Sequence, residues 1–297
     1  MYKKVLLSFL AISISVSSIK ATTSPSFSHE FSLGFESMRY FYKEPNIYQN
    51  DLARELGAVW MNDTGNLYGF NGSYRLTWKE TLFIQPEGRI LYGKHDYRTG
   101  RKEIVNGKTK NKIPALVYEL RLIMGGKIPM MDKKLTLSPY TGIGYRFKSD
   151  DSEDVKYIDL RPNIRRSPKV LGYYRKSNYV YVPLGASAEY TLDDTWSVSL
   201  KGEYDWIVKA WHYSRNRNFI NIGSNTFKQP NGYGIKGEAS ISYLYNKVKF
   251  SVSPYINYWN IRNSKVNKIR GDDGHSYSTS EPYNITWESG VRLGVAF

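Results

Sequence analysis

The amino-acid sequence predicts an all-β fold, a transmembrane antiparallel up-and-down β-barrel of about ten strands. Runs of about a dozen residues alternate apolar and polar side chains with the period of two that is typical of β-strands. The connections between these runs are short and long in turn, as expected when strands cross a membrane and return. The mean hydropathy of -0.51 excludes a bundle of transmembrane helices but suits a barrel, since only every second strand residue meets lipid.

Residues 1–21 are predicted to form a signal peptide. Lys3 and Lys4 make a short basic start, residues 5–19 are apolar with interspersed serines, and Ala21 supplies a small residue for cleavage. The stretch is too short and too rich in serine to favour a membrane-spanning helix. A retained anchor and a soluble amphipathic start are the alternatives. We expect export and a single β-barrel domain over residues 22–297.

The first three predicted strands cover residues 30–42, 68–78 and 82–92. In the first strand, Phe31 and Leu33 lie on the side opposite Glu36, and the next two strands repeat this alternation with an arginine in each polar row. Residues 79–81 make a tight turn between the second and third strands. Residues 52–61 alternate poorly, and if they formed a further strand with a partner the barrel would have about twelve strands.

The next three predicted strands cover residues 116–124, 135–147 and 180–190, and each sets an aliphatic or aromatic row against a polar one. A short connection joins the first two of them, whereas a long basic connection, residues 95–112, comes before and the longest, residues 148–177, comes after. Four prolines fall within predicted strands of the chain, and we expect β-bulges at them. They are Pro86, Pro139, Pro183 and Pro254.

The last four predicted strands cover residues 196–208, 235–243, 248–258 and 284–297. Trp196 and Leu200 oppose Lys201 in the first of them, and the same alternation of apolar and polar residues runs through the others. Short turns at 191–195 and 245–247 alternate with the long polar connections 212–230 and 261–281. Both termini are therefore expected at the end of the barrel that carries the short turns.

The last strand shows the pattern most clearly. Trp287 and Phe297 lie on its apolar face, about 24 Å apart along the membrane normal, close to the apolar band of about 25 Å that such barrels present to lipid. Arg292 and Glu288 lie on its inner face. This end resembles the last strands of bacterial outer-membrane β-barrel proteins. The resemblance implies an outer-membrane domain over residues 22–297, export through the periplasm of a Gram-negative bacterium, and recognition of the strand ending in Phe297 by the outer-membrane assembly machinery.

In size and strand count the chain resembles the omptins, outer-membrane proteases whose site joins acidic residues to an Asp-x-His sequence. Here the nearest match is Ala210-Trp211-His212, which lacks the aspartate, and Trp60-Met61-Asn62-Asp63 offers one acid rather than a pair. None of the four histidines has a serine in a context that suggests a nucleophile and its base. We therefore predict no catalytic residues, and an omptin-like or other outer-membrane hydrolase remains the second alternative.

Neither a cofactor nor a metal is predicted. The chain has no cysteine, which excludes disulfides, thiol catalysis and cysteine-based metal sites. The acidic clusters at 150–154 and 272–275 do not have the spacing of a calcium-binding loop, and we interpret them as solvated. No cofactor-binding or metal-ligating residues are assigned.

The inward face of the predicted strands carries charges of both signs. The basic residues expected to line the lumen are Arg75, Arg89, Arg121, Arg146, Lys201, Lys236, Lys249 and Arg292. The acidic residues expected there are Glu87, Glu119, Glu203, Asp205, Glu238 and Glu288. A basic wall favours a narrow porin, that is, a channel for small anionic solutes. Pairing of the two signs across the lumen would instead give a closed barrel whose function lies in its loops.

The chain is strongly basic, with a formal net charge of +15, and its long loops hold many of the positive charges. These are Arg98, Arg101, Lys102, Lys108, Lys110 and Lys112, then Arg161, Arg165, Arg166, Lys169, Arg175 and Lys176, then Lys265, Lys268 and Arg270. We expect anionic partners: outer-membrane lipid and lipopolysaccharide, acidic glycans or anionic solutes. Adhesion or a structural role at the cell surface is thus the first alternative to a channel. No nucleic-acid-binding motif is present, so nucleic acid is not an expected partner.

Overall fold

A computed structural model describes residues 27–47, 50–51, 57–161, 169–170, 173–216, 223–271 and 274–297. The predicted signal peptide, residues 1–21, lies outside the described residues. No helix in these ranges is both long and apolar enough to span a membrane.

Ten long strands form the barrel wall. They are β1 (Phe27–Glu44), β2 (Trp60–Trp78), β3 (Leu82–Arg101), β5 (Ile113–Gly126), β7 (Leu135–Asp151), β10 (Tyr173–Thr191), β11 (Trp196–Asn216), β13 (Gly232–Tyr245), β14 (Val248–Ile261) and β17 (Asn284–Ala296). Shorter strands extend the connections between them. They are β4 (Ile104–Thr109), β6 (Ile128–Met130), β8 (Lys156–Asp159), β9 (Lys169–Val170), β12 (Gly223–Gln229), β15 (Asn267–Arg270) and β16 (Ser276–Thr279).

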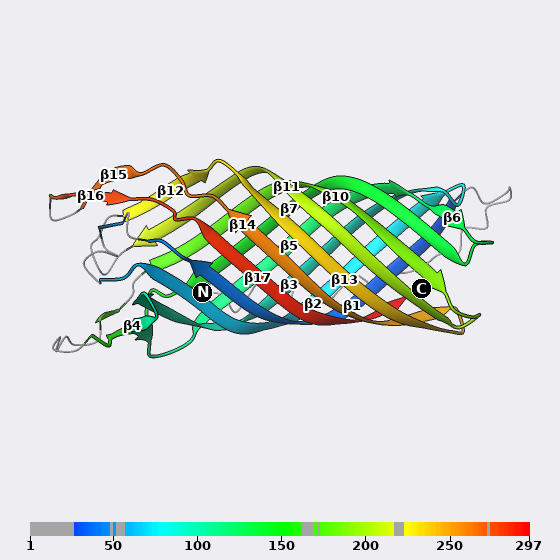
Figure 1. The fold of residues 1–297 in the computed structure, drawn as a ribbon, viewed down its shortest axis with the longest axis horizontal. Coiled ribbons are helices and arrows are strands. Elements are labelled where there is room, and N and C mark those ends of the chain that lie inside the picture. Colours follow the sequence, from blue (N-terminus) through cyan, green and yellow to red (C-terminus); the bar gives the residue numbers. More distant parts are fainter. Residues whose placement is uncertain are drawn as a thin grey trace, which may run out of the picture.

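The long strands close into one antiparallel barrel. Each pairs with the next in chain order, and β17 pairs back with β1 to complete the circle. At this seam the backbones of Phe31 and Phe297 exchange hydrogen bonds of 3.1 and 2.9 Å. Figure 1 shows the tilted strands, with β4, β12 and the β15–β16 hairpin at one end of the barrel, here called the long-loop end. The predicted ten-strand barrel is confirmed. The twelve-strand alternative is wrong, because ten strands close the circle; of the poorly alternating stretch, Trp60 and Met61 belong to β2, and residues 52–56 lie outside the described residues.

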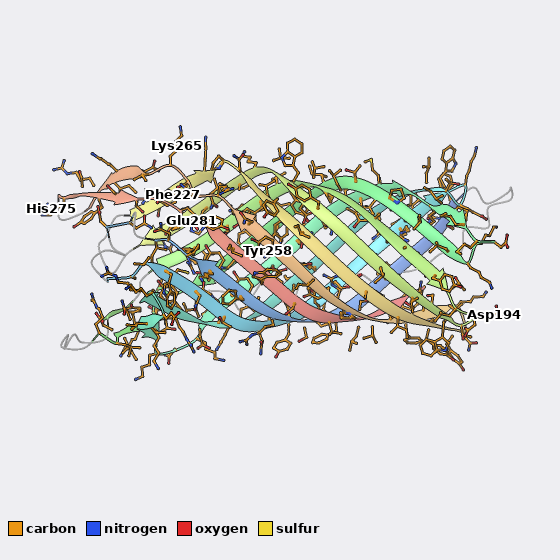
Figure 2. The ribbon with its side chains drawn as sticks, viewed as in Figure 1. Asp194, Phe227, Tyr258, Lys265, His275 and Glu281 are labelled. Atoms are coloured by element: carbon orange, nitrogen blue, oxygen red, sulfur yellow. The ribbon has the colours of Figure 1, made fainter. Side chains whose placement is uncertain are left out.

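At the opposite end, here called the short-turn end, tight turns connect neighbouring strands. Two of them have positive φ angles at both central residues: 49° and 57° at Lys79 and Glu80, and 46° and 69° at Asn246 and Lys247. This is the backbone form of a type I′ turn, whose twist matches that of the strands it joins. Both turns lie where the sequence places them. In Figure 2, Asp194 marks the short-turn end, whereas Lys265 and His275 mark the long-loop end.

The outer wall is apolar on every long strand. Phe70, Leu120 and Leu200, for example, are 67%, 58% and 66% exposed. Aromatic rings lie at both edges of this surface: Tyr258 and Trp287 have ring centroids 4.6 Å apart, and Phe31 stacks on Phe297 at 6.3 Å. A continuous apolar surface bordered by aromatic rings is stable in lipid rather than in water.

Two expectations about the strands are corrected. The strands run further into the long-loop end than predicted, because there they are polar on both faces and show no alternation: β3 extends to Arg101 and β11 to Asn216. The prolines are not bulge sites. Pro86 and Pro254 stay in register with Leu122 and Val291, and the register shift between β10 and β11 falls at Val180 and Tyr181 instead.

Candidate functional site

The middle of the lumen is filled by charged side chains from facing strands. Arg89 on β3 lies at their centre, where its guanidinium donates to Glu36 at 2.9 Å, to Glu119 at 2.8 Å and to Glu288 at 2.8 Å. The three carboxylates come from β1, β5 and β17, so one arginine ties together strands on different sides of the barrel. The side chains of Arg89, Glu36, Glu119 and Glu288 are all at most 6% exposed.

Further ion pairs spread from this centre across the lumen. Lys236 on β13 contacts Glu119 at 2.8 Å, Glu203 at 3.1 Å and Asp205 at 3.0 Å. Arg146 on β7 pairs with Glu288. We call the connected set the lumen network. It comprises Glu36, Glu87, Arg89, Glu119, Arg121, Arg146, Glu203, Asp205, Lys236, Glu238, Glu288 and Arg292.

Several members and neighbours of the lumen network were not singled out from the sequence. Glu36 accepts hydrogen bonds from Tyr255 at 2.5 Å and Arg292 at 3.1 Å, and the Tyr181 hydroxyl donates to Glu119. Trp259 lies between two cations, 4.9 Å from Arg146 and 5.1 Å from Lys236. Their inward position follows from strand alternation, but their contacts across the lumen do not, because these depend on how the barrel closes.

The arrangement brings buried charges of opposite sign together. Buried charges are tolerated only when they are paired and hydrogen-bonded. Six of the eight predicted basic lumen residues pair with a carboxylate, and these are Arg89, Arg121, Arg146, Lys236, Lys249 and Arg292. Lys249 pairs with Glu189 outside the lumen network, and Arg75 and Lys201 are not paired with a carboxylate in the described lumen: Arg75 donates to Gln85 at 2.6 Å, and Lys201 lies 5.3 Å from the Tyr140 ring.

Between the lumen network and the short-turn end lies a cavity of about 430 Å³, here called the lower cavity. Its wall includes both network members and residues that stand apart from it, among them Arg75, Lys201 and Lys249. Lys249 pairs with Glu189, whose side chain is 41% exposed, so water reaches this part of the lumen.

A second set of buried charges lies toward the long-loop end. We call it the mouth cluster: Glu44, Asp63, His95, Lys148, Asp150 and Arg175. Arg175 donates to Asp63 at 2.8 Å and to Asp150 at 2.7 Å. The sequence suggested that Arg175 belongs to an exposed basic loop. That expectation is wrong, because the described strand β10 turns this side chain inward.

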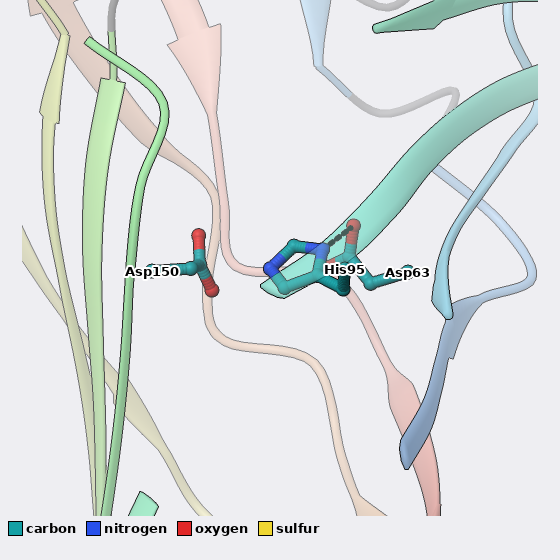
Figure 3. Close-up of side chains that lie close together, drawn as sticks. All are labelled: Asp63, His95 and Asp150. Atoms are coloured by element: carbon teal, nitrogen blue, oxygen red, sulfur yellow. Dashed lines mark ion pairs between the residues drawn. The ribbon is translucent and has the colours of Figure 1, made fainter. Parts of the chain in front are cut away.

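The mouth cluster contains a group that could hold a metal ion. Asp63, His95 and Asp150 each offer one ligand atom, and these atoms lie within 4.8 Å of one another. Figure 3 shows the His95 ring between the two carboxylates, with its ion pair to Asp63 at 3.2 Å. Arg175 and Lys148 already neutralise these carboxylates, so a further cation would meet two positive groups.

Beside the mouth cluster, His212 lies between a hydroxyl and a carboxyl. Its Nδ1 is 3.0 Å from the Ser177 hydroxyl and its Nε2 is 3.2 Å from Glu281. The sequence pattern did not suggest this pair, because Ser177 and His212 face each other across β10 and β11, which only the strand register reveals. Burial raises the pKa of the Glu281 carboxyl well above its usual range, and the neighbouring Glu44 carboxylate raises it further.

Exposed basic side chains gather at the long-loop end. They are Arg98, Arg101, Lys102, Lys108, Lys110 and Lys112 on and around β4, and Lys265, Lys268 and Arg270 on and before β15. Arg165 and Arg166 lie outside the described residues. The β15–β16 hairpin projects beyond the barrel wall (Figure 1), and the side chains of Lys268 and Arg270 on it are exposed.

No protein-family model matches the sequence, and no curated protein matches it significantly. Among solved structures, the chain is similar to the outer membrane protease OmpT from Escherichia coli, with a TM-score of 0.65 and 12% identity over 93% of this chain and 99% of that one. It is less similar to OprG from Pseudomonas aeruginosa, with a TM-score of 0.36 and 11% identity over 91% and 96% of the two chains. The first of these likenesses shows the fold, that of a bacterial outer-membrane β-barrel.

Proposed function

We propose that this chain, a bacterial outer-membrane β-barrel of ten strands, acts as a closed barrel whose long-loop end binds acidic glycans at the cell surface. The observation that carries the proposal is the lumen network. Arg89 and its three carboxylate partners occupy the middle of the lumen, and the surrounding pairs link strands on facing sides of the barrel.

The porin hypothesis fits this geometry less well. A channel for small anionic solutes needs cations that face water and attract the passing ion. In the described lumen the central cations instead face carboxylates. Lys236, for example, contacts three of them, Glu119, Glu203 and Asp205. Passage of an anion would require these pairs to separate, which leaves buried charges without partners.

The long-loop end supports a role in binding. Its exposed lysines and arginines lie on two separate parts of the surface, one around β4 and one at the β15–β16 hairpin. Flexible, solvated cations bind multivalent anions by charge, and the strength of such binding falls with salt. Acidic glycans are anions of this kind that a protein at the bacterial surface meets.

The proposal is tested by binding of the detergent-solubilised protein to immobilised heparin or dextran sulfate. Replacing Lys108, Lys110 and Lys112 by glutamine is expected to weaken binding about tenfold at low salt, with a smaller effect as salt rises. The matched control replaces Lys79, Lys134 and Lys247 at the short-turn end. Equal binding by the two triple variants would contradict the assignment of the surface to the long-loop end.

A second candidate, an outer-membrane hydrolase, is favoured by one observation: Ser177, His212 and Glu281 stand in the order of a nucleophile, a base and an orienting acid. The similar structure OmpT is described as a protease. The candidate ranks second because all three residues are buried and the raised pKa of Glu281 favours the neutral acid, which orients an imidazolium poorly. Absence of peptide and ester hydrolysis by the wild-type protein would eliminate the hydrolase, and hydrolysis that survives both Ser177→Ala and His212→Ala would eliminate this triad as its site.

A further inference from the structure

The lower cavity has a wall of unbalanced charge. Eight basic residues and five acidic ones line it. Most of the acids are already paired: Glu87 with Arg121, Glu189 with Lys249 and Glu238 with Arg292. Outside the lumen network, the wall carries four cations, Arg75, Lys127, Lys201 and Lys249, and two carboxylates, Glu30 and Glu189, so this part of the cavity is basic.

Three cations of the wall make no ion pair with a carboxylate in the described part of the chain. Arg75 donates to the amide oxygen of Gln85 at 2.6 Å and lies 4.8 Å from the Phe83 ring, Lys201 lies 5.3 Å from the Tyr140 ring, and the Lys127 side chain has no hydrogen-bond partner among the described residues. Burial lowers the pKa of Lys127, and the neighbouring Arg75 guanidinium lowers it further. These groups come from β2, β11 and the connection after β5, so they surround the cavity.

Serine side chains also line the cavity, alongside these cations. Ser32 and Ser73 bond each other at 2.7 Å, and Ser240 bonds Ser253 at 2.6 Å. Ser187, Ser199 and Ser251 also line the cavity, and their hydroxyls have no hydrogen-bond partner in the described part of the protein. Such hydroxyls can both donate to and accept from the hydroxyls of a ligand.

We infer that the lower cavity is a binding site for a small anionic saccharide, a sugar unit that carries a phosphate or a carboxylate. The three cations hold the charged group, and the serine hydroxyls bond the sugar hydroxyls. The volume of about 430 Å³ lies in the range of ordinary ligand sites and suits one or two sugar units. Because the lumen network closes the cavity on one side, the ligand enters and leaves at the short-turn end, which in barrels of this class faces the periplasm.

The first test measures the charge selectivity of the cavity without assuming a ligand. The chain has no cysteine, so Ser199→Cys places a single thiol in the cavity wall. The thiol is modified with an anionic and with a cationic methanethiosulfonate reagent. We expect the anionic-to-cationic ratio of the two modification rates to be about tenfold higher at this thiol than at Leu192→Cys, which lies in an exposed turn. Adding Arg75→Gln and Lys201→Gln abolishes the preference, whereas Lys247→Gln, outside the cavity at the same end, keeps it. Equal ratios at the two thiols would overturn the inference.

The second test identifies the ligand chemistry by calorimetry on the detergent-solubilised chain. Glucose 6-phosphate and glucuronate are the anionic probes, and glucose and inorganic phosphate are the controls. We expect one anionic sugar to bind at least tenfold tighter than either control, and Lys201→Gln to weaken it about tenfold while Lys247→Gln has no effect. Binding of phosphate as tightly as of glucose 6-phosphate, or no binding by either anionic sugar, would overturn the saccharide assignment. Heat-modifiable migration in gels verifies that each variant is folded.

Discussion

At the scale of single residues, buried charges in this barrel depend on having partners of opposite sign. Arg146 shows this most simply, because Glu288 is the carboxylate with which it pairs in the described lumen. Glu288 also accepts from Arg89 at 2.8 Å and from Asn257 at 3.0 Å. Loss of its charge would leave Arg146 as a buried cation without a counter-ion.

Glu288→Gln is therefore expected to lower the free energy of unfolding by roughly 3–5 kcal/mol, the cost of breaking a buried ion pair. Urea unfolding of the protein in lipid vesicles measures it. The control is Glu189→Gln, since Glu189 and Lys249 are 41% and 35% exposed and such a pair contributes about 1 kcal/mol or less. Equal destabilisation by the two substitutions would contradict a buried lumen network.

A second prediction at this scale concerns pH and Glu281. Its pKa in the folded protein lies above the ordinary value of 4.5, chiefly because of burial, so the folded state binds the proton more tightly than the unfolded state. The contribution to stability is fully present below about pH 4.5 and is lost as the pH rises through the folded-state pKa.

Hydrogen exchange at the backbone amides of Ser264 and Glu281, which bond the other residue of the pair, measures this loss of stability. The Ser264 amide donates to the Glu281 carbonyl oxygen at 2.9 Å, and the Glu281 amide donates to the Ser264 hydroxyl at 2.9 Å. After correction for intrinsic rates, their protection is expected to fall with rising pH in the wild type and to change less in Glu281→Gln. The same pH dependence in both proteins would assign the effect to another group.

At the scale of elements, each of the ten long strands could be predicted from its own alternation, but its partners across the lumen could not. The outward rows of β14 and β17 follow directly from the period of two, and so does the inward position of Arg292. That Arg89 meets Glu288 depends on the register of all the strands between them, which no local pattern specifies. The parts of β10 and β11 at the long-loop end were not predicted, because they lie beyond the lipid and are polar on both faces. For the same reason the pairing of Ser177 with His212 was not predicted.

The close pairing of β2 with β3 gives a prediction for one glycine. A Cβ atom on Gly69 would lie 1.8 Å from the Ile90 carbonyl oxygen, so a larger residue must push the two backbones apart. Gly69→Ala is expected to lower the free energy of unfolding by about 1–3 kcal/mol, as overpacking does. Gly202→Ala is the control, because nothing lies within 4 Å of the added atom. Urea unfolding compares the two, and equal stability would contradict this register.

At the scale of the whole molecule, the barrel divides along its axis into parts that differ in how their charges are arranged. A group of exposed basic residues lies at the long-loop end, paired charges of the lumen network fill the middle, and the lower cavity lies toward the short-turn end. The composition indicated anionic partners, but it could not distinguish these parts of the barrel. Lysine and arginine are paired with carboxylates in the lumen network and are exposed at the long-loop end, and composition counts both alike.

Electrical recording in planar lipid bilayers tests the closed lumen most directly. The purified barrel is expected to insert without conductance steps, because the pairs around Arg89 block the path of ions. Charge removal at Glu36 and Glu288 together, in protein shown to be folded, is expected to produce measurable steps. Anion-selective steps from the wild-type protein, with a reversal potential that shifts when Arg75, Arg89 and Arg121 are neutralised, would contradict the closed barrel and favour the porin.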